Sequence, residues 1–189
     1  MRQVIYSMMV TLDGYIAAPN EGLEWGNVDE ELHRFANDQE RQMGGHLYGR
    51  RMYEVMTFWS TPAPDSPSAP DYIREYAQIW RAIPKVVFSR TLDKVEGNAR
   101  LVRDDVAGEV MKLKAQPGGD LVVGGAGLAA SFAQLGLIDE YQLFIHPVIL
   151  GRGKRMFAEV DRVSNLRLVD THRFSSGVMF LRYALAPDG

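Results

Sequence analysis

The chain has 189 residues, of which 46% are hydrophobic and 24% are charged, with a formal net charge of -3 and no cysteine. This length suits one hydrophobic core, because cores tend to divide only above about 250 residues, and we expect a single domain over residues 1–189. The lack of cysteine excludes disulfides, thiolate metal sites and thiol nucleophiles, and the small net charge argues against nucleic acid as a partner.

The first predicted element is a strand over residues 4–10, a nearly continuous apolar run of the kind that is buried on both faces of a sheet. The run is too short to span a membrane and lacks a signal-cleavage pattern, so we expect a cytoplasmic protein without membrane contact. Asp13-Gly14 then turns the chain. Apolar residues at helical spacing from Leu32 to Met43 predict a helix that ends at Gly44-Gly45.

The middle of the chain alternates short strands with helices. The expected strands cover residues 46–48, 85–88 and 101–102, and the expected helices cover residues 72–80 and 106–113. Ser68 and Asp71 are spaced as a start signal for the first of these helices. Four prolines between residues 61 and 70 predict an exposed loop without regular structure, which is also a candidate lid over a site.

The last third of the chain begins with a strand that runs directly into glycines. Residues 121–123 predict this buried strand, residues 124–127 read Gly-Gly-Ala-Gly, and the helix that follows ends at Gly136. A strand over residues 141–145 and a hairpin over residues 166–174 and 178–185 complete the chain. The alternation predicts an α/β fold with a mostly parallel sheet covered on both faces, to which the hairpin adds antiparallel strands.

The glycines at 124–127 have two interpretations. Their backbone amides, at the start of a helix, are suited to bind a pyrophosphate, but a tight turn also needs glycine for its dihedral angles. Gly125, Gly127 and Ala130 also match the dinucleotide fingerprint of the Rossmann fold. That fingerprint normally opens the first βαβ unit and is followed by an acid that binds the ribose, and neither holds here.

Three arginines follow predicted strands, at the edge where ligands of such sheets bind. They are Arg50, Arg51 and Arg90. The planar guanidinium group binds phosphate oxygens in pairs, so these arginines favour NADPH over NADH. Taken singly, an arginine is more often a solvated surface charge.

The candidate proton donors are carboxyl groups near the start of the chain. Asp13 follows the first strand, and Asp29, Glu30 and Glu31 lie at the start of the first helix. Such a group can hold or protonate a ring nitrogen of a substrate, although acids at a helix start are more often there for capping. The four histidines show no metal-ligand spacing, and we expect no metal.

Taken together, these segments resemble the dihydrofolate reductase-like proteins, and specifically the stand-alone relatives of the reductase domain of the riboflavin pathway. The resemblance covers nearly the whole chain and depends on the order of its segments: LDGYIA (residues 12–17), YGRRMYE (48–54), FSRT (88–91), VGGAGL (123–128), and GLIDE (136–140) leading to HPVILG (146–151). It implies a mixed eight-stranded sheet with flanking helices, NADPH along the carboxyl edge and usually a homodimer.

The resemblance also implies roles for individual residues. Arg50, Arg51, Ser89 and Arg90 are expected around the adenosine phosphate, and Gly49 is expected among the residues that bind the cofactor. Gly124, Gly125, Ala126, Gly127 and Leu128 are expected at the pyrophosphate, and Ile16 and Ala17 beside the nicotinamide. Asp13 and Glu31 are the candidate catalytic acids.

We therefore expect an NADPH-dependent reductase that transfers hydride to a small heterocyclic substrate, pterin-like or ribosylaminopyrimidine-like. The riboflavin-pathway reductases carry an acid just before the glycines, where this chain has Val123. The alternative is therefore a non-catalytic NADPH- or nucleotide-binding module with a degenerate substrate pocket.

Overall fold

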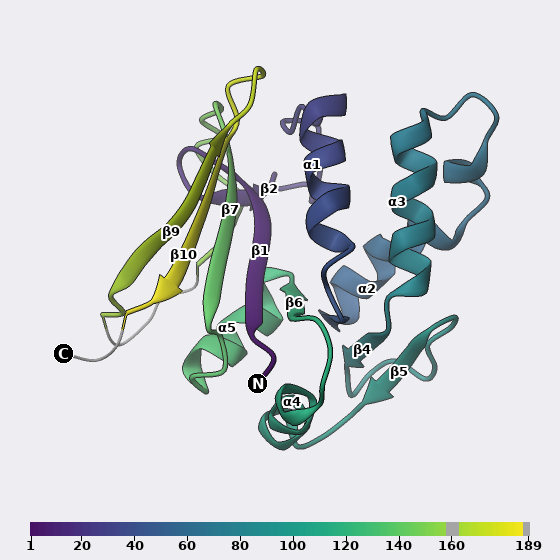
Figure 1. The fold of residues 1–189 in the computed structure, drawn as a ribbon, viewed down its shortest axis with the longest axis vertical. Helices are drawn as coiled ribbons and strands as arrows, with labels where there is room; N and C mark the ends of the chain where they lie inside the picture. The colour runs from purple at the N-terminus through teal and green to yellow at the C-terminus, as the bar shows by residue number, and fades with distance from the viewer. Residues whose placement is uncertain (158–162, 187–189) are drawn as a thin grey trace.

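An eight-stranded sheet forms the centre of the computed structural model, which describes residues 1–157 and 163–186 (Figure 1). In spatial order the strands are β5 (Ala99–Val102), β4 (Lys85–Phe88), β3 (Gly45–Gly49), β6 (Leu121–Gly124), β1 (Val4–Thr11), β7 (Glu140–His146), β10 (Met179–Leu185) and β9 (Leu166–Arg173). The first six are parallel, and β10 and β9 form an antiparallel hairpin beside β7. The predicted fold class is therefore confirmed.

Helices cover both faces of this sheet, as the alternation of elements predicts. The helices are α1 (Glu30–Glu40), α2 (Arg50–Met56), α3 (Asp71–Ala82), α4 (Val106–Ala115) and α5 (Ala126–Gln134). On one face, Leu113 of α4 and Phe132 of α5 are buried in a cluster with Leu47 and Val86. On the other face, α3 buries Trp80 against Tyr48. No helix in the described ranges is long and apolar enough to cross a membrane.

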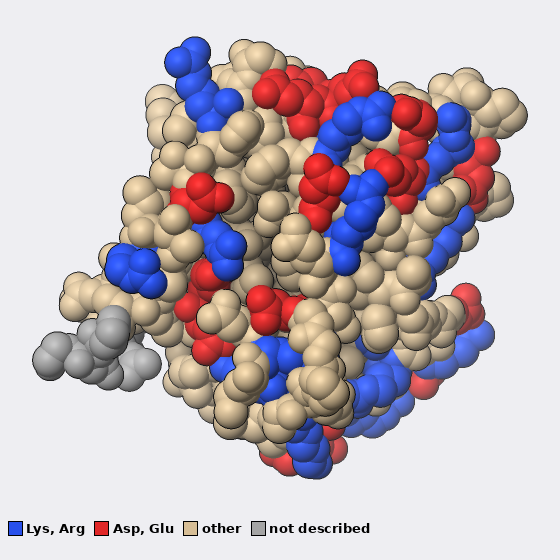
Figure 2. Space-filling model, in the orientation of Figure 1, with Lys and Arg blue, Asp and Glu red and all other residues tan. Residues whose placement is uncertain are grey.

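Helices α1 and α3 lie side by side (Figure 1), and ion pairs join them. Arg34 of α1 binds Asp71 at the start of α3 at 2.8 Å, and Arg41 pairs with Glu75. Figure 2 shows the resulting mixture of positive and negative side chains over these two helices. Exposed pairs of this kind contribute at most about 1 kcal/mol each. The buried contacts between the helices are those of the His33 ring with Tyr72 and Tyr76, at 5.2 and 5.4 Å between ring centroids, and the hydrogen bond that Asn37 donates to the Tyr72 carbonyl at 3.0 Å.

The predicted end of the first helix is wrong by four residues. The helix ends at Glu40 with Arg41 as its C-cap, and Gly45 is the first residue of β3. Gly44 is glycine for a different reason: a Cβ there would lie 2.4 Å from the carbonyl oxygen of Gly119, and the Gly44 N–H donates to the Asp120 carbonyl. The two segments approach too closely for a side chain.

The proline-rich loop is more regular than its composition predicts. Ala63–Asp65 forms a short 3-10 helix within it, which its prolines permit because proline is tolerated in the first turn of a helix. A second 3-10 helix, Thr57–Ser60, lies just before the loop. Arg81 of α3 holds the loop by donating to the Thr61 carbonyl at 3.1 Å and pairing with Asp65 at 2.8 Å. The start signal at Ser68 is also wrong, since Pro70 is the N-cap of α3.

Two very short strands escaped the sequence analysis altogether. β2 (Tyr15–Ala17) pairs with β8 (Lys154–Arg155) in a separate two-stranded sheet. Pieces of two and three residues carry no readable periodicity. They matter because β2 lies directly after the turn that ends β1.

Candidate active site

The carboxyl ends of three neighbouring strands meet at one edge of the sheet. Strands β4, β3 and β6 are adjacent and parallel, with Gly49 opposite Phe88 and Tyr48 opposite Gly124. The segments that follow these strands therefore start at the same level of the sheet. The structure brings together the glycines and the basic segments that the sequence singled out.

Two of the glycines are needed by the fold itself. Gly125 has φ +89°, a conformation that side chains rarely adopt, and it is the N-cap of α5. A Cβ on Gly124 would lie 3.0 Å from Cε of Met52, and one on Gly125 would lie 3.2 Å from Cβ of the same residue. The tight turn and its packing against α2 are therefore sufficient to explain why positions 124 and 125 are glycine.

The fold does not require glycine at position 127. Gly127 lies in the first turn of α5, it is exposed, and a Cβ there would meet nothing within 4 Å. Glycine in a helix is less stable than alanine by about 1 kcal/mol, so the fold alone would favour a side chain at this position. The N-cap also provides no side-chain acceptor for the first amides of the helix. The start of α5 is thus open and offers free N–H donors, the arrangement that binds phosphate groups.

Arg50 and Ser89 meet at a shared neighbour. Arg50 donates to Thr91 at 3.2 Å and to Glu54 at 2.8 Å, and the Ser89 hydroxyl accepts the N–H of Thr91 at 3.2 Å. Arg90 is 79% exposed and pairs with Asp104 at 3.1 Å. Arg103, which the sequence analysis did not select, donates to the Arg90 carbonyl at 3.4 Å. The ends of β3, β4 and β5 therefore carry a group of arginines with solvent-facing guanidiniums.

Arg51 lies apart from this group. Its guanidinium pairs with Glu21, in the loop between β2 and α1, at 3.1 Å. Gly49 and Leu128 lie next to each other, since a Cβ on Gly49 would lie 3.7 Å from Cβ of Leu128. The binding roles of all these residues stay predictions.

Ile16 and Ala17 are buried in β2, at 5% and 9% exposure. Ile16 belongs to the core cluster that includes Val10 and Val123, near the carboxyl ends of β1 and β6. Ala17 pairs with Lys154 of β8, and Gly153 beside it is so close that a Cβ would lie 2.1 Å from the Ala17 carbonyl oxygen. The residues expected beside the nicotinamide are therefore fixed by the 151–155 segment.

The two candidate acids already hold structural partners. The Asp13 carboxylate accepts hydrogen bonds from the Thr11 hydroxyl at 2.6 Å, the Gly151 N–H at 2.7 Å and the Leu150 N–H at 3.1 Å. These bonds lower the pKa of Asp13 to about 2, and the bond from Thr11 has the largest effect. Glu31 accepts from the hydroxyl and the N–H of Ser175, which lowers its pKa. Both carboxylates tie separate loops together, and their catalytic role stays a prediction.

A buried histidine at the same edge was missed, because the sequence analysis tested the histidines only for metal spacing. His146 ends β7 opposite Thr11, is 1% exposed, and contacts Trp25 edge-on with ring centroids 5.4 Å apart. His146 Nε2 and Trp25 Nε1 are both buried without a hydrogen-bond partner in the described ranges. The available signal was a polar residue at the carboxyl end of a strand.

This histidine gives a prediction for the dependence of stability on pH. Burial lowers the pKa of His146, and also that of His33, below the ordinary 6.5. The unfolded chain then takes up protons before the folded chain does, so stability falls as the pH drops through 6.5 and below. We expect the free energy of unfolding in urea to be lower at about pH 5.5 than at about pH 7.5, with a slope of at most about 1.4 kcal/mol per pH unit for each proton.

The substitution His146→Gln removes one of the two groups and keeps a polar side chain. We expect it to make the slope between these pH values shallower, and His33→Gln to act likewise. If both single variants kept the full slope of the parent protein, burial of these rings would not be its cause.

Comparison with known proteins identifies relatives of this chain. The family model of the RibD C-terminal domain matches residues 2–180. The uncharacterized protein YyaP of Bacillus subtilis is 38% identical over 183 residues, covering 96% of this chain and 94% of that protein.

Two solved structures show the same fold. A putative riboflavin biosynthesis protein from Shewanella sp. PV-4 has a TM-score of 0.75 at 21% identity, covering 98% of this chain and 99% of that one. Dihydrofolate reductase from Enterococcus faecalis, complexed with NADP(H), has a TM-score of 0.58 at 14% identity, covering 97% and 96%. The predicted resemblance to dihydrofolate reductase-like proteins is confirmed.

Proposed function

This chain belongs to the RibD C-terminal domain family, and on that basis we propose that it is an NADPH-dependent reductase of a small heterocyclic substrate, pterin-like or ribosylaminopyrimidine-like. One observation carries the proposal: the open start of α5 lies at the same sheet edge as the arginines that follow β3 and β4. The fold shared with a dihydrofolate reductase that binds NADP(H) supports it.

The residues at this edge fit a phosphorylated dinucleotide. The free amides of Ala126, Gly127 and Leu128 would hold the pyrophosphate, with Gly127 leaving the space above them open. Arg50 and Arg90, with Ser89 directly before Arg90, would hold the adenosine phosphate. The acidic partners Glu54 and Asp104 are exposed, so the arginines can exchange them for a phosphate.

At the reacting end, the chain provides a wall and orientation more than acid catalysis. When bound, NADPH supplies the hydride. Ile16 and Ala17 would exclude water from one side of the site, because both are buried. Asp13 and Glu31 are ionised at neutral pH, since hydrogen bonds lower the pKa of each, so they would orient a substrate and leave the proton to solvent.

Steady-state oxidation of NADPH with a panel of pterins and aminopyrimidines tests the reductase. We expect turnover of at least one member of the panel. Quenching of NADPH fluorescence without turnover of any member would instead support the binding-module alternative. No response to NADPH in either measurement would refute both.

The arginines give a prediction about cofactor choice. Replacing Arg50 or Arg90 by alanine removes a charged hydrogen bond to the phosphate that NADH lacks. We expect each change to weaken NADPH by about 1 to 3 kcal/mol, about 5- to 150-fold in Kd, and to leave NADH almost unchanged. Calorimetric titration with both nucleotides measures this, with Arg167→Ala on β9 as the control. Equal weakening of both nucleotides would contradict the assignment.

We also propose that the protein is a homodimer, formed through the outer sheet. Leu168 lies opposite Tyr183, and Leu181 lies opposite Leu143, so these apolar side chains share one face. Leu168 is 48% exposed and Leu166 is 41% exposed, and exposed apolar patches commonly mark interfaces. Light scattering should give a dimer for the parent protein and a monomer for Leu168→Glu. A monomeric parent protein would exclude this interface.

A further inference from the structure

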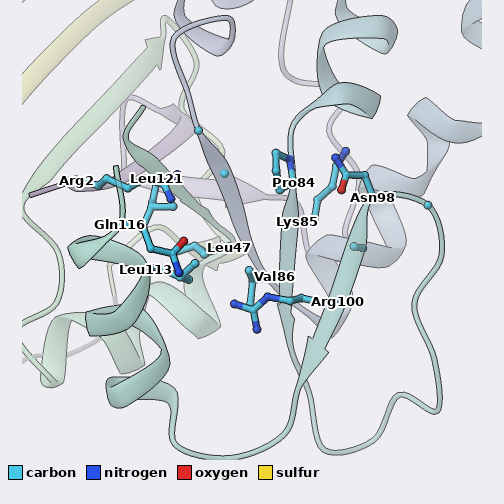
Figure 3. Close-up of a pocket in the computed structure, with 14 residues that line it drawn as sticks. Arg2, Leu47, Pro84, Lys85, Val86, Asn98, Arg100, Leu113, Gln116 and Leu121 are labelled. Atoms are coloured by element: carbon cyan, nitrogen blue, oxygen red, sulfur yellow. The ribbon is translucent and has the colours of Figure 1, made fainter. Parts of the chain in front are cut away.

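A pocket lies at the opposite edge of the sheet, where strands begin (Figure 3). Its lining includes the first residues of four strands, which are Gly45, Lys85, Ala99 and Leu121. Its volume is about 340 Å³, near the lower end of the range for small-molecule sites. Because the proposed cofactor site uses the carboxyl ends, this amino-edge pocket is separate from it.

The floor of the amino-edge pocket is apolar. Leu47, Val86 and Leu121 of the sheet and Leu113 of α4 line it, and all four are buried. Val86 and Leu113 keep 5% and 7% exposure, and this is the apolar surface that the body of a ligand would cover. At this volume, the body is the size of a single ring.

Arg2 brings an unsatisfied donor to this pocket. Its Nε donates to the Gly119 carbonyl at 2.5 Å, which fixes the guanidinium, while Nη2 is buried without a hydrogen-bond partner among residues 1–157 and 163–186. The residue is only 8% exposed, and a Cβ on Gly45 would lie 3.5 Å from this Nη2. A buried donor of this kind favours a ligand that provides an acceptor.

Arg100 brings a second cation at the mouth of the pocket. Figure 3 shows its guanidinium extended beside Val86, and it pairs with Glu109 of α4. The Lys85 ammonium is occupied by other partners, because it donates to the Trp80 carbonyl and lies 3.8 Å from the centre of the Trp80 ring. Asp120 is the nearby counter-charge of Arg2, and its carboxylate also accepts the Gln3 N–H at 2.7 Å.

We propose that the amino-edge pocket binds a small carboxylic acid built on a single ring with a second hydrogen-bond acceptor. The ring lies on the leucine and valine floor. The carboxylate pairs with Arg100, replacing Glu109, and the second acceptor takes the free N–H of Arg2. A guanidinium group suits this exchange because it binds carboxylate oxygens in pairs.

Calorimetric titration of the full chain with 4-hydroxybenzoate tests the proposal. We expect saturable binding at millimolar concentration, unchanged when NADPH is added. The amide 4-hydroxybenzamide keeps the ring and hydroxyl but lacks the charge, and we expect it to bind about tenfold more weakly. Benzoate lacks the second acceptor, and it should also bind more weakly. Equal affinity for the acid and its amide would overturn the proposal. If benzoate bound as tightly as 4-hydroxybenzoate, the proposed contact between Arg2 and the second acceptor would be wrong.

Two variants should change this affinity in opposite directions. Arg100→Met removes the cation and should weaken 4-hydroxybenzoate about tenfold or more, whereas Glu109→Gln frees Arg100 and should tighten binding several-fold. A damaged fold cannot explain tighter binding, so the second variant keeps the test clear. Arg103→Met, at the other end of β5, is the matched control and should bind as the parent does. Unchanged affinity in Arg100→Met, or no gain in Glu109→Gln, would overturn the proposal.

Discussion

Replacing Gly127 by glutamate should weaken NADPH binding strongly and leave the fold at least as stable as before. A carboxylate in the first turn of α5 would occupy the open space above the free amides and repel the pyrophosphate. We expect the Kd for NADPH to rise about 100-fold or more, a loss of at least about 2.7 kcal/mol. The free protein should be unaffected or stabilised by up to about 1 kcal/mol, because glycine is a poor helix former and an acid at a helix start is favourable.

The matched control for this variant is Ser131→Glu. It adds the same charge one turn further along α5, at an exposed position. NADPH titration and urea unfolding of the two variants separate binding from stability. If Gly127→Glu lost stability and Ser131→Glu did not, the fold itself would require glycine at position 127, despite the open space around it. If both variants bound NADPH equally well, the pyrophosphate would not lie on α5.

The parts of the fold that could be predicted are those with a strong local pattern. The apolar run of β1, the glycine stop after α5 and the hairpin of β9 and β10 each have a signal within a few residues, and each is confirmed. Strand order has no such signal. The approach of β3, β4 and β6 at one edge followed from the general rule that parallel strands bind ligands at their carboxyl ends.

What could not be predicted depends on contacts between distant residues. The carboxylate of Asp13 is bound by amides 137 and 138 residues away, and that of Glu31 by a serine 144 residues away. No local pattern reports such partners, so the sequence could offer these acids only as candidates. The same holds for the contact of His146 with Trp25 and for the separation of Arg51 from Arg50.

The substitution Gly153→Ala should cause the largest loss of stability of those considered. Its φ of +145° is rarely adopted by residues with a side chain, and the new Cβ would lie 2.1 Å from the Ala17 carbonyl oxygen. Neither atom can move without separating β8 from β2. We expect a loss of about 3 kcal/mol or more in the free energy of unfolding, which is about 10 °C in Tm for a chain of this size. Because Ala17 must shift, NADPH should also bind more weakly.

Gly151→Ala separates backbone strain from the close contact. Gly151 also has a positive φ, of +77°, but a Cβ there would meet nothing within 4 Å. Only the conformational strain is added, so we expect a loss of about 1 kcal/mol, and Ala17 should stay in place. Thermal unfolding and NADPH titration of the two variants measure the difference. Equal losses in both would mean that β2 is not held by the close approach of Gly153, and the fixed position assigned to Ile16 and Ala17 would then lack its physical basis.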